Sequence, residues 1–294
     1  MVDLVVLVSR FPVADTKEPI EKFQYAHGGQ TATAMVACSR LGLHASYIGR
    51  FGDDDNGARA RENLDFERVD TGDCLTAEGV LNGFSVILVD KETGTRTVLS
   101  SREPELRIAP SEVDRTSVCA GRTLLVDCHD TAASTVAARY AREAGIPTLI
   151  DVERVRPGVE DLLSEIDIII AAEEFPQAFT GRADHGAALR MIRDTYDATA
   201  VCVTLGAAGS LALVGDVEIR TPPFRVPVVD STGAGDVFRG GFIAGWLRSG
   251  ADAAIEEILC YANAVAAINC KGIGARGRLP NPAEVEELLR GEAV

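Results

Sequence analysis

The sequence predicts an α/β protein with a central, mostly parallel β-sheet flanked by helices on both faces. From residue 123 onward, short β-branched runs alternate with longer amphipathic segments, the pattern of repeated βα units. A polar hairpin-like segment near residue 90 interrupts this pattern and predicts a small separate sheet. No repeat or low-complexity linker divides the 294 residues. We therefore expect a single domain, 1–294, with the small sheet inserted from about 12–26 and 72–104.

The first hundred residues contain strand-like runs and two helix-like segments. We expect strands at 4–8 and 45–48 and helices at 31–41 and 56–64, the first helix ending at Gly42. A hairpin follows, with strands 79–89 and 95–99 around the turn Lys91–Gly94, and residues 20–24 can join its sheet.

The rest of the chain follows a regular βα order. We expect strands at 123–126, 148–151, 167–171 and 200–204, and helices at 131–144, 159–163, 173–196 (broken near Gly181), 237–247 and 252–269. Three glycines in the helix 237–247 predict close packing against a backbone or a ligand. Ligands of parallel sheets bind beyond the carboxyl ends of the strands. Asp151, Thr204 and Asp236 follow apolar runs and are expected to gather there.

Composition excludes several classes of function. The formal net charge of −15 argues against non-specific binding to nucleic acid or to an anionic membrane. No apolar run is long enough to span a bilayer, and Met1–Val8 lacks the basic region of a signal peptide, so we expect a cytoplasmic protein. The seven cysteines include no C-x-x-C pair and are expected to be buried free thiols. The four histidines are scattered, which argues against a zinc site.

The most informative segment is Val-Asp-Ser-Thr-Gly-Ala-Gly-Asp, residues 229–236, which precedes an apolar helix. Its glycines allow a sharp bend, after which the first amides of the helix would converge on an anion. Asp236 would lie beside that anion site. Amides that hold a phosphoryl group next to a carboxylate that accepts a proton suit phosphoryl transfer. The alternative is an ordinary turn with a favourable acidic residue in the first helical turn.

The longer pattern D-x-T-G-A-G-D-x-F-x-x-G-F, from Asp230 to Phe242, resembles the signature of the ribokinase-like (PfkB) carbohydrate and nucleoside kinases. The resemblance covers nearly the whole chain. It implies the ribokinase-like fold, in which the small sheet acts as a lid. It also implies that Asp236 is the catalytic base and that the amides of Gly233, Ala234 and Gly235 form the anion hole.

The same resemblance assigns residues to the acceptor sugar. Its G-G-x-x-x-N motif matches Gly28, Gly29 and Thr33, where threonine replaces the usual asparagine, and Gln30 can also bond to vicinal hydroxyls. The family's hydroxyl-binding aspartate corresponds to Asp3 or Asp15, and the spacing to Gly28 favours Asp3. This chain then starts late: the first core strand is absent or reduced to Met1–Val2, which would expose a sheet edge.

Two glycine-containing segments are assigned to the nucleotide. Residues Thr204, Gly206 and Gly209 resemble the family's T-L-G-x-x-G loop, which lies against nucleotide phosphates. The resemblance also places Gly272, Gly274 and Asn263 near the nucleotide, although a buried polar residue with a backbone partner is an equal reading of Asn263. The segment 272–277 also matches G-x-G-x-x-G, but it follows a helix rather than a strand, which argues against dinucleotide binding. No Walker A sequence occurs.

Metal and lid residues match less closely. Arg96 corresponds to a phosphate-reaching arginine of the ketohexokinase-like branch, with a surface residue as the alternative. Ala-Glu-Glu-Phe at 172–175 replaces the family's N-x-x-E, so Glu173 or Glu174 is the candidate for holding Mg²⁺ through water. Asp230 and Thr232 are candidates for a monovalent cation such as K⁺.

The resemblance therefore implies an ATP-dependent, Mg²⁺-requiring sugar kinase, nearest the ketohexokinase-like branch. It also implies a homodimer formed through the lid, with a sugar and ATP as the only partners. The altered motifs leave open a catalytically impaired sugar- or nucleotide-binding protein on the same fold, and a nucleoside kinase is a further alternative. A dinucleotide-dependent oxidoreductase is disfavoured.

Overall fold

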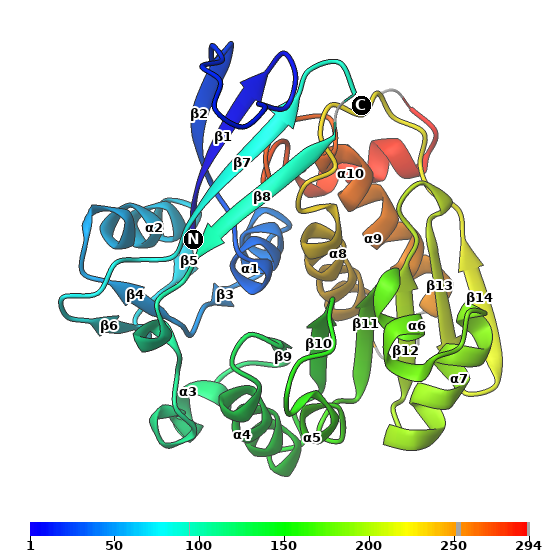
Figure 1. Ribbon diagram of the computed structural model, residues 1–294. Helices are drawn as coiled ribbons and strands as arrows, with labels where there is room; N and C mark the ends of the chain where they lie inside the picture. The colour runs from blue at the N-terminus through cyan, green and yellow to red at the C-terminus, as the bar shows by residue number, and fades with distance from the viewer. Residues whose placement is uncertain (94, 251–253, 293–294) are drawn as a thin grey trace.

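A six-stranded sheet forms the middle layer of the molecule, a computed structural model that describes residues 1–93, 95–250 and 254–292 (Figure 1). The strand order is β14-β13-β12-β11-β10-β9. The bounds are β9 Leu124–Asp127, β10 Thr148–Val152, β11 Ile168–Ala172, β12 Ala200–Thr204, β13 Ser210–Val214 and β14 Val217–Thr221. Strands β9 to β12 are parallel, as predicted, whereas β13 and β14 add an antiparallel hairpin that the sequence analysis missed.

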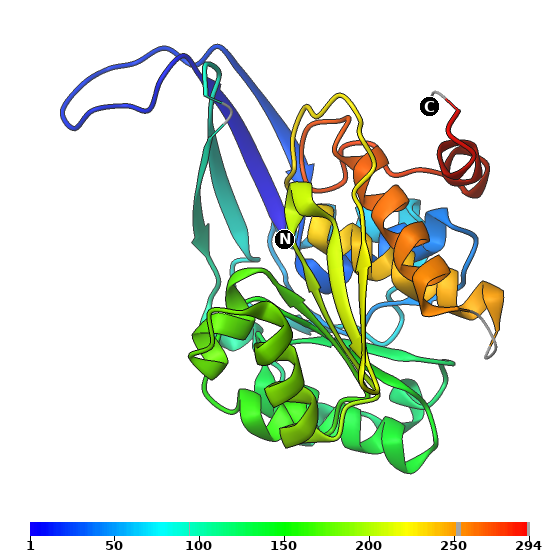
Figure 2. The same ribbon diagram turned by 90° about the vertical axis from the view of Figure 1, so that its right-hand side faces the viewer.

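Helices cover both faces of this sheet (Figure 2). One face packs against α1 Gln30–Arg40, α8 Ala234–Ser249 and α9 Ile255–Asn269, and the other against α4 Thr131–Glu143, α5 Val159–Leu163, α6 Glu174–Thr180 and α7 His185–Tyr196. Successive strand residues point to opposite faces. Ile168 and Ile170 therefore join the core beneath α8 and α9, while Ile169 joins the core beneath α4 to α7.

Helix boundaries agree with the sequence analysis to within a few residues. The expected break near Gly181 is confirmed by the separate helices α6 and α7, and the expected start of α9 at Asp252 lies outside the described residues. Helices α2 (Asp55–Phe66) and the short α3 (Arg115–Val118) complete the N-terminal half. The C-terminal helix α10 (Pro282–Leu289) was missed, although Asn281 and Glu284 form the capping box that marks its start.

The glycines of α8 bring three helix backbones close together. A Cβ on Gly240 would lie 2.6 Å from the Cβ of Ala37 in α1, and one on Gly241 would lie 3.0 Å from the Cα of Ala262 in α9. Larger side chains would push these helices apart. The predicted close packing is confirmed, and it fixes the position of the N-terminus of α8.

A second, four-stranded sheet, the lid, lies beside the carboxyl ends of the central strands (Figure 1). Its order is β2-β1-β7-β8, with β1 Val2–Val8, β2 Lys22–His27, β7 Phe84–Asp90 and β8 Arg96–Ser101. Gly94, in the predicted turn, lies outside the described residues. The expected small sheet is confirmed, but its extent differs. Residues 2–8 belong to the lid rather than to a core strand, since β1 pairs with β2 and β7. Within the expected 72–104 segment, β6 (Leu75–Ala77) pairs instead with β4 (Arg50–Gly52).

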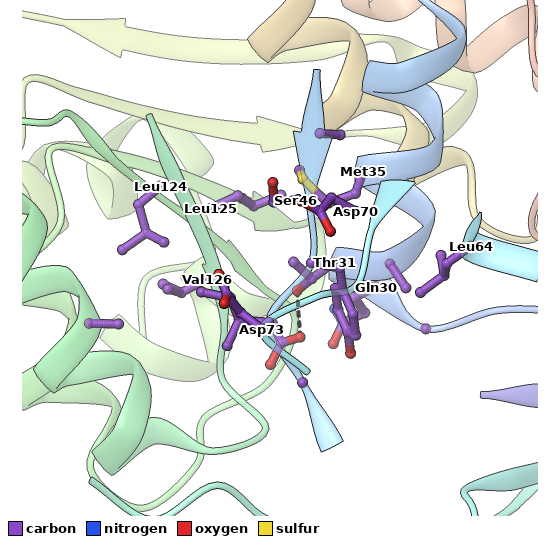
Figure 3. Close-up of a pocket in the computed structure, with 18 of the residues that line it drawn as sticks. Gln30, Thr31, Met35, Ser46, Leu64, Asp70, Asp73, Leu124, Leu125 and Val126 are labelled. Atoms are coloured by element: carbon purple, nitrogen blue, oxygen red, sulfur yellow. Dashed lines mark hydrogen bonds between the residues drawn. The ribbon is translucent and has the colours of Figure 1, made fainter. Parts of the chain in front are cut away.

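A cavity of about 740 Å³ lies beside β9, the last strand of the central sheet (Figure 3). Leu124 and Val126 of β9 line one side, and Met35 of α1 lines another. Two short strands, β3 (Ala45–Ser46) and β5 (Val69–Asp70), pair with each other and also contribute to the lining. A hydrogen bond from Thr31 Oγ1 to Asp127 Oδ2, 2.6 Å long, links α1 to β9. Among the described residues, β9 is thus the end strand of the central sheet and faces this cavity.

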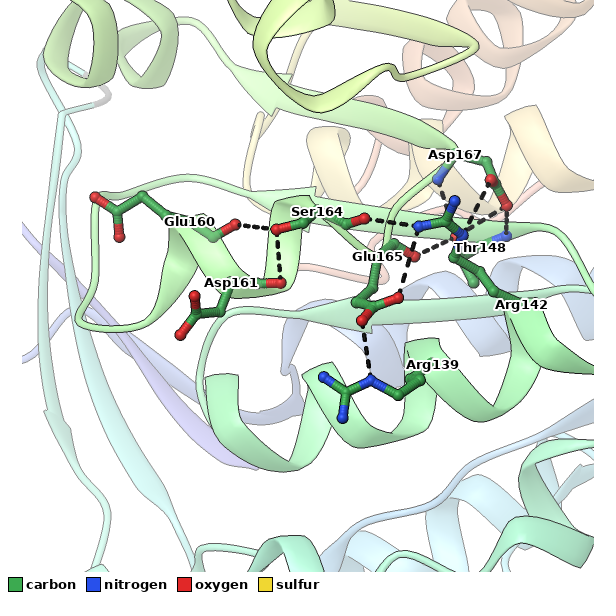
Figure 4. Close-up of polar contacts among 8 residues, drawn as sticks. All are labelled: Arg139, Arg142, Thr148, Glu160, Asp161, Ser164, Glu165 and Asp167. Carbon is green, nitrogen blue, oxygen red and sulfur yellow. Dashed lines mark hydrogen bonds and ion pairs between the residues drawn. The ribbon is translucent and has the colours of Figure 1, made fainter.

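At the opposite, amino end of the central strands, polar contacts fix the start of β10 and β11 (Figure 4). Asp167 Oδ2 accepts hydrogen bonds from the backbone N–H and the hydroxyl of Thr148, at 2.8 and 3.0 Å. Glu165 forms ion pairs with Arg139 and Arg142 of α4. These pairs are exposed, so each is expected to contribute less than about 1 kcal/mol to stability.

All seven cysteines are free, and burial raises the pKa of Cys38 and Cys202 to about 12, which makes these thiols unreactive. Within the described ranges, no helix combines the length and apolar character needed to cross a bilayer. The same residues include no group of three or more His, Cys, Asp or Glu side chains placed to hold a metal ion.

Candidate active site

The bend before α8 is built as the glycine pattern predicts. Gly233 has φ of +71°, and any Cβ there would collide with the backbone of Ala275, whose Cα would lie 2.7 Å away. Only glycine combines this left-handed conformation with such close approach. The Ala234 N–H donates to the Ser231 carbonyl (3.2 Å), and Asp236 follows in the first turn of α8. The N-terminus of α8 therefore presents Gly235 and Asp236 at the carboxyl edge of the sheet.

Asp236 lies against a second carboxylate, Asp151, at the end of β10. Arg239, one turn further along α8, places Nη2 2.8 Å from Asp151 Oδ1 and donates to the Ile170 carbonyl at 3.1 Å. The side chains of Arg239 and Asp151 are 2% and 1% exposed, so this is a buried ion pair. The expected gathering of Asp151 and Asp236 is thus confirmed.

The two carboxyl groups shift each other's protonation. Burial raises the pKa of Asp151 to about 7, against the attraction of Arg239. Burial, followed by repulsion from Asp151, raises the pKa of Asp236 well above its usual value. Asp236 is close enough to Asp151 for a hydrogen bond between the two side chains when one of the carboxyl groups is protonated. The pair therefore holds a proton more tightly than isolated carboxylates do.

The residues assigned to the acceptor sugar lie together beneath the lid. Asp3 of β1 is buried and so close to Gly28 that a Cβ at Gly28 would collide with the Asp3 carboxylate. Burial raises the pKa of Asp3. Gly29, with φ of +96°, is the N-cap of α1, and Thr33 follows on the first turn of that helix. Asp15, the alternative to Asp3, is exposed.

Gln30 and Arg276 complete this group. Gln30 begins α1, and its side-chain Nε2 is buried without a hydrogen-bond partner. Arg276, which the sequence analysis did not select, donates from Nε to Thr33 Oγ1 (3.2 Å) and from Nη2 to the Gly28 carbonyl (3.3 Å). It reaches the acceptor region from the loop after α9.

That loop also supports the bend before α8. A Cβ on Gly272 would collide with Gly277, so the loop closes on itself. The Gly274 N–H donates to Asp230 Oδ2 at 2.8 Å, while Asp230 Oδ1 accepts from the N–H and hydroxyl of Thr232 at 2.8 and 2.7 Å. Both oxygens of Asp230 are thus engaged in shaping the loop, and the cation role of Asp230 and Thr232 stays a prediction.

Arg96 connects the lid with this bend. Its Nη1 donates to Ser231 Oγ at 3.3 Å, from β8 to the loop before α8. The side chain is exposed. Its role toward a phosphate stays a prediction.

The residues assigned to the nucleotide phosphates follow β12. Thr204 ends that strand, and its hydroxyl contacts the Ala171 carbonyl at 3.4 Å. Gly206 and Gly209 have φ of +50° and +85°, and a Cβ on Gly209 would collide with the Thr221 carbonyl. Asn263 of α9 donates to Ser210 Oγ at 3.1 Å, and Ser210 is the first residue after this loop, so the bond ties the end of the loop to α9.

Glu173 and Glu174 lie at the start of α6, after β11. Both side chains are exposed, and the Glu173 carbonyl contacts His185 Nε2 at 3.3 Å. They follow β11 at the carboxyl edge of the sheet, and no ion pair of either side chain is found among the described residues. Mg²⁺ commonly keeps several waters and takes only one or two carboxylates, so this sparse set fits it.

Comparison with known proteins decides the family. A family model described as pfkB family carbohydrate kinase matches residues 1–282. An ATP-dependent ribose-1-phosphate kinase from Halopiger xanaduensis is 30% identical over 278 residues, covering 93% of this chain and 90% of the relative. The chain belongs to the pfkB family of carbohydrate kinases. A ribokinase from Haemophilus influenzae is 28% identical and covers 92% of this chain and 89% of its own length.

Solved structures agree with the carbohydrate kinase fold. A putative ribokinase from Agrobacterium tumefaciens superposes with a TM-score of 0.91 at 24% identity, covering 99% of this chain and 94% of its own. Arabidopsis thaliana ribokinase complexed with ribose and ATP gives 0.82 at 22% identity, covering 98% and 96%. The ribokinase-like fold expected from the resemblance is confirmed. The ketohexokinase-like branch is a finer assignment that these relatives do not carry.

Two residues of this carbohydrate kinase escaped the sequence analysis. Arg239 is a lone charge in the apolar stretch from Val237 to Ala244, and such a charge signals a buried partner. Arg276 lies within the glycine loop that was considered only for its backbone. Nothing in the local sequence indicates that Arg276 reaches back to Gly28, 248 residues earlier.

Proposed function

We propose that this carbohydrate kinase transfers the γ-phosphate of ATP to a sugar hydroxyl, with Asp236 as the base. The observation that carries the proposal is the place of Asp236. It lies on the first turn of α8, and the loop that packs on Gly233 of the preceding bend also sends Arg276 to Gly28 in the acceptor group. A hydroxyl beside Asp236 would be aligned with a phosphate held at the helix N-terminus.

The sugar hydroxyl oxygen bonds to the γ-phosphorus, the bond from that phosphorus to the bridging oxygen breaks, and ADP leaves. Asp236 accepts the hydroxyl proton, an effect typically worth ~10²–10⁴-fold in rate. The amides of Gly233, Ala234 and Gly235 would hold the transferred group, the Ala234 N–H giving up its bond to Ser231. Mg²⁺, for which Glu173 and Glu174 are the candidate residues, would neutralise phosphate charge when bound.

The candidate acceptors are a ketohexose, ribose and ribose 1-phosphate. The expected ketohexose rests on the Arg96 motif, whereas the relatives are named ribokinase and ribose-1-phosphate kinase. ATP consumption should therefore be measured with fructose, ribose, ribose 1-phosphate and a nucleoside. Turnover of any of these supports the kinase. Ligand binding without turnover of any acceptor would overturn the proposal in favour of a binding protein on the same fold.

The carboxyl pair predicts an acidic limb in the pH profile. Asp236 must be deprotonated to act as a base, so kcat/KM is expected to rise with pH as the pair loses its shared proton. In Asp151→Asn the repulsion that raises the Asp236 pKa is gone, so the limb is expected to move to lower pH. Profiles of kcat/KM from about pH 5 to 9 test this. An unmoved limb would show that Asp151 does not set the protonation of Asp236.

We also propose that two copies pair through their lids. Phe23 and Tyr25 of β2 and Val98 and Leu99 of β8 are more than half exposed, at 60, 57, 51 and 57%. Exposed apolar side chains on the lid sheet would be removed from water if they packed against a second copy of the chain. Sedimentation equilibrium should give the mass of a dimer, and the mass of a single chain would contradict pairing through the lids.

The free thiols support the expected cytoplasmic location, where cysteines stay reduced.

A further inference from the structure

Arg276 carries a positive charge into the acceptor region without a contacting counter-charge. Its three hydrogen-bond acceptors are the Thr33 hydroxyl, the Gly28 carbonyl and the side-chain oxygen of Asn63, the last at 2.6 Å from Nη1. All three are neutral. Within the described part of the chain, no carboxylate oxygen lies within the 4.0 Å of the guanidinium that defines an ion pair.

The surrounding ionisable groups do not compensate for this charge at contact distance. Glu67 is held by Arg40 through bonds of 2.6 and 2.9 Å. Burial, together with Arg276, lowers the pKa of His27 to about 4, so this side chain is neutral at pH 7. Burial lowers the pKa of Arg276 itself to about 10, despite the attraction of Glu67, Asp236 and Asp3. The guanidinium remains charged at neutral pH, in surroundings that disfavour it.

A second donor faces the same space. Arg276 and Gln30 both line the cavity described above, and the buried Nε2 of Gln30 has no acceptor. Buried donors are nearly always paired in folded proteins, so the Gln30 amide requires an acceptor such as a ligand oxygen or an ordered water. Together the two side chains offer N–H groups and a full positive charge on the acceptor side. Oxygen atoms of a phosphate or a carboxylate match this combination, because a guanidinium binds both in a planar fork.

We propose that the acceptor of this kinase is a sugar that carries an anionic group, with Arg276 and Gln30 binding that group. This inference rests on the proposed function, since it names the substrate class of the same site. The charge of Arg276 selects for the anion, and the lid residue Asp3 and the Gly28 turn remain available for hydroxyls. A neutral sugar could offer a hydroxyl oxygen to the Gln30 amide, but it would leave the guanidinium without an anionic partner.

The test compares neutral and anionic acceptors of the same skeleton. The pairs are ribose with ribose 1-phosphate, fructose with fructose 1-phosphate, and glucose with gluconate. We expect the wild-type kcat/KM to favour the anionic member of at least one pair. Arg276→Gln should lower kcat/KM for that member by roughly 10- to 100-fold, the usual worth of a hydrogen bond to a charged group. The loss for the neutral member should be clearly smaller, because only the contacts of Arg276 with Thr33 and Gly28 are removed there, and the KM for ATP should change little.

Arg278→Gln is the matched control. Arg278 lies in the same loop two residues later, but its Nη2 pairs with Glu284 at 2.8 Å. This variant should keep the preference for the anionic acceptor. Calorimetric titration of each acceptor without ATP gives a readout that does not depend on turnover, and folding of every variant is checked by thermal unfolding.

The outcomes separate the possible failures. Preference for ribose 1-phosphate or fructose 1-phosphate identifies a phosphate, and preference for gluconate identifies a carboxylate. Equal use of neutral and anionic sugars, or an equal loss on both in Arg276→Gln, overturns the inference while leaving the kinase intact. A higher KM for ATP alone would assign Arg276 to the nucleotide and also overturn it. Absence of turnover with every acceptor contradicts the proposed function, and calorimetry still decides whether the site prefers anions.

Discussion

Asp236→Asn is expected to lower kcat by ~10²–10⁴-fold, because the amide cannot accept the proton of the attacking hydroxyl. The KM for ATP should be nearly unchanged, since asparagine has the shape of aspartate and leaves the backbone of the bend intact. Steady-state kinetics with the best acceptor measure both quantities. The buried Asp236 pKa is raised, so its ionised form disfavours the folded state above the ordinary aspartate pKa. The variant should therefore be no less stable than the wild type at pH 8.

Asp216→Asn is the control for this substitution. Asp216 makes an ion pair with Arg193, and its side chain is 97% exposed. This change should leave kcat and KM at wild-type values. If Asp236→Asn also retained wild-type kcat, Asp236 would lose the base role and the proposed mechanism would fail.

Arg239→Met should destabilise the fold by about 3–5 kcal/mol, the usual cost of removing one partner of a buried ion pair. The substitution leaves Asp151 and Asp236 next to each other without their cation. It also removes the hydrogen bond to the Ile170 carbonyl, because methionine has no donor to replace the guanidinium. The loss should be larger at pH 8 than at pH 5, because protonation relieves the repulsion between the carboxyl groups. Urea unfolding at both pH values measures it.

Arg139→Met provides the comparison on α4. Arg139 is 53% exposed and pairs with Glu165, so its loss should cost less than about 1 kcal/mol. The double variant Asp151→Asn, Arg239→Met removes a carboxylate as well as the cation and should recover part of the stability. Equal costs for Arg239→Met and Arg139→Met would mean that the buried pair does not hold α8 to β10.

The central sheet could be predicted because its strands are short β-branched runs buried on both faces. Ile168 to Ala172 and Ala200 to Thr204 are such runs. A continuous apolar run of this length can be recognised from the local sequence without knowledge of distant contacts. The hairpin of β13 and β14 was harder, because Val217 to Thr221 alternates exposed and buried residues like many edge segments. The position of β1 was also not predictable. An apolar run such as Val2 to Val8 suits a lid strand as well as a core strand, and only its pairing with β7 decides.

The site divides in the same way. The bend before α8 could be located because its glycines and Asp236 are consecutive in the sequence. The ion pair between Asp151 and Arg239 joins residues 88 positions apart, and it follows from the packing of α8 on β10. The contacts of Arg276 with Gly28 and Thr33 depend on the closed loop after α9. Tertiary contacts of this kind leave no periodic signal in one sequence.

The position of β9 at the end of the central sheet has a consequence for handling the protein. Backbone N–H and C=O groups on its outer side face the cavity rather than a neighbouring strand, and Leu124 and Val126 flank them. Such an edge is a template for intermolecular strand pairing, and the usual protection by lysine or proline is missing from Leu124 to Asp127. Here α1 and the short strands β3 and β5 line the same cavity and cover this side of β9, so aggregation through the strand is expected only under conditions that open the cavity.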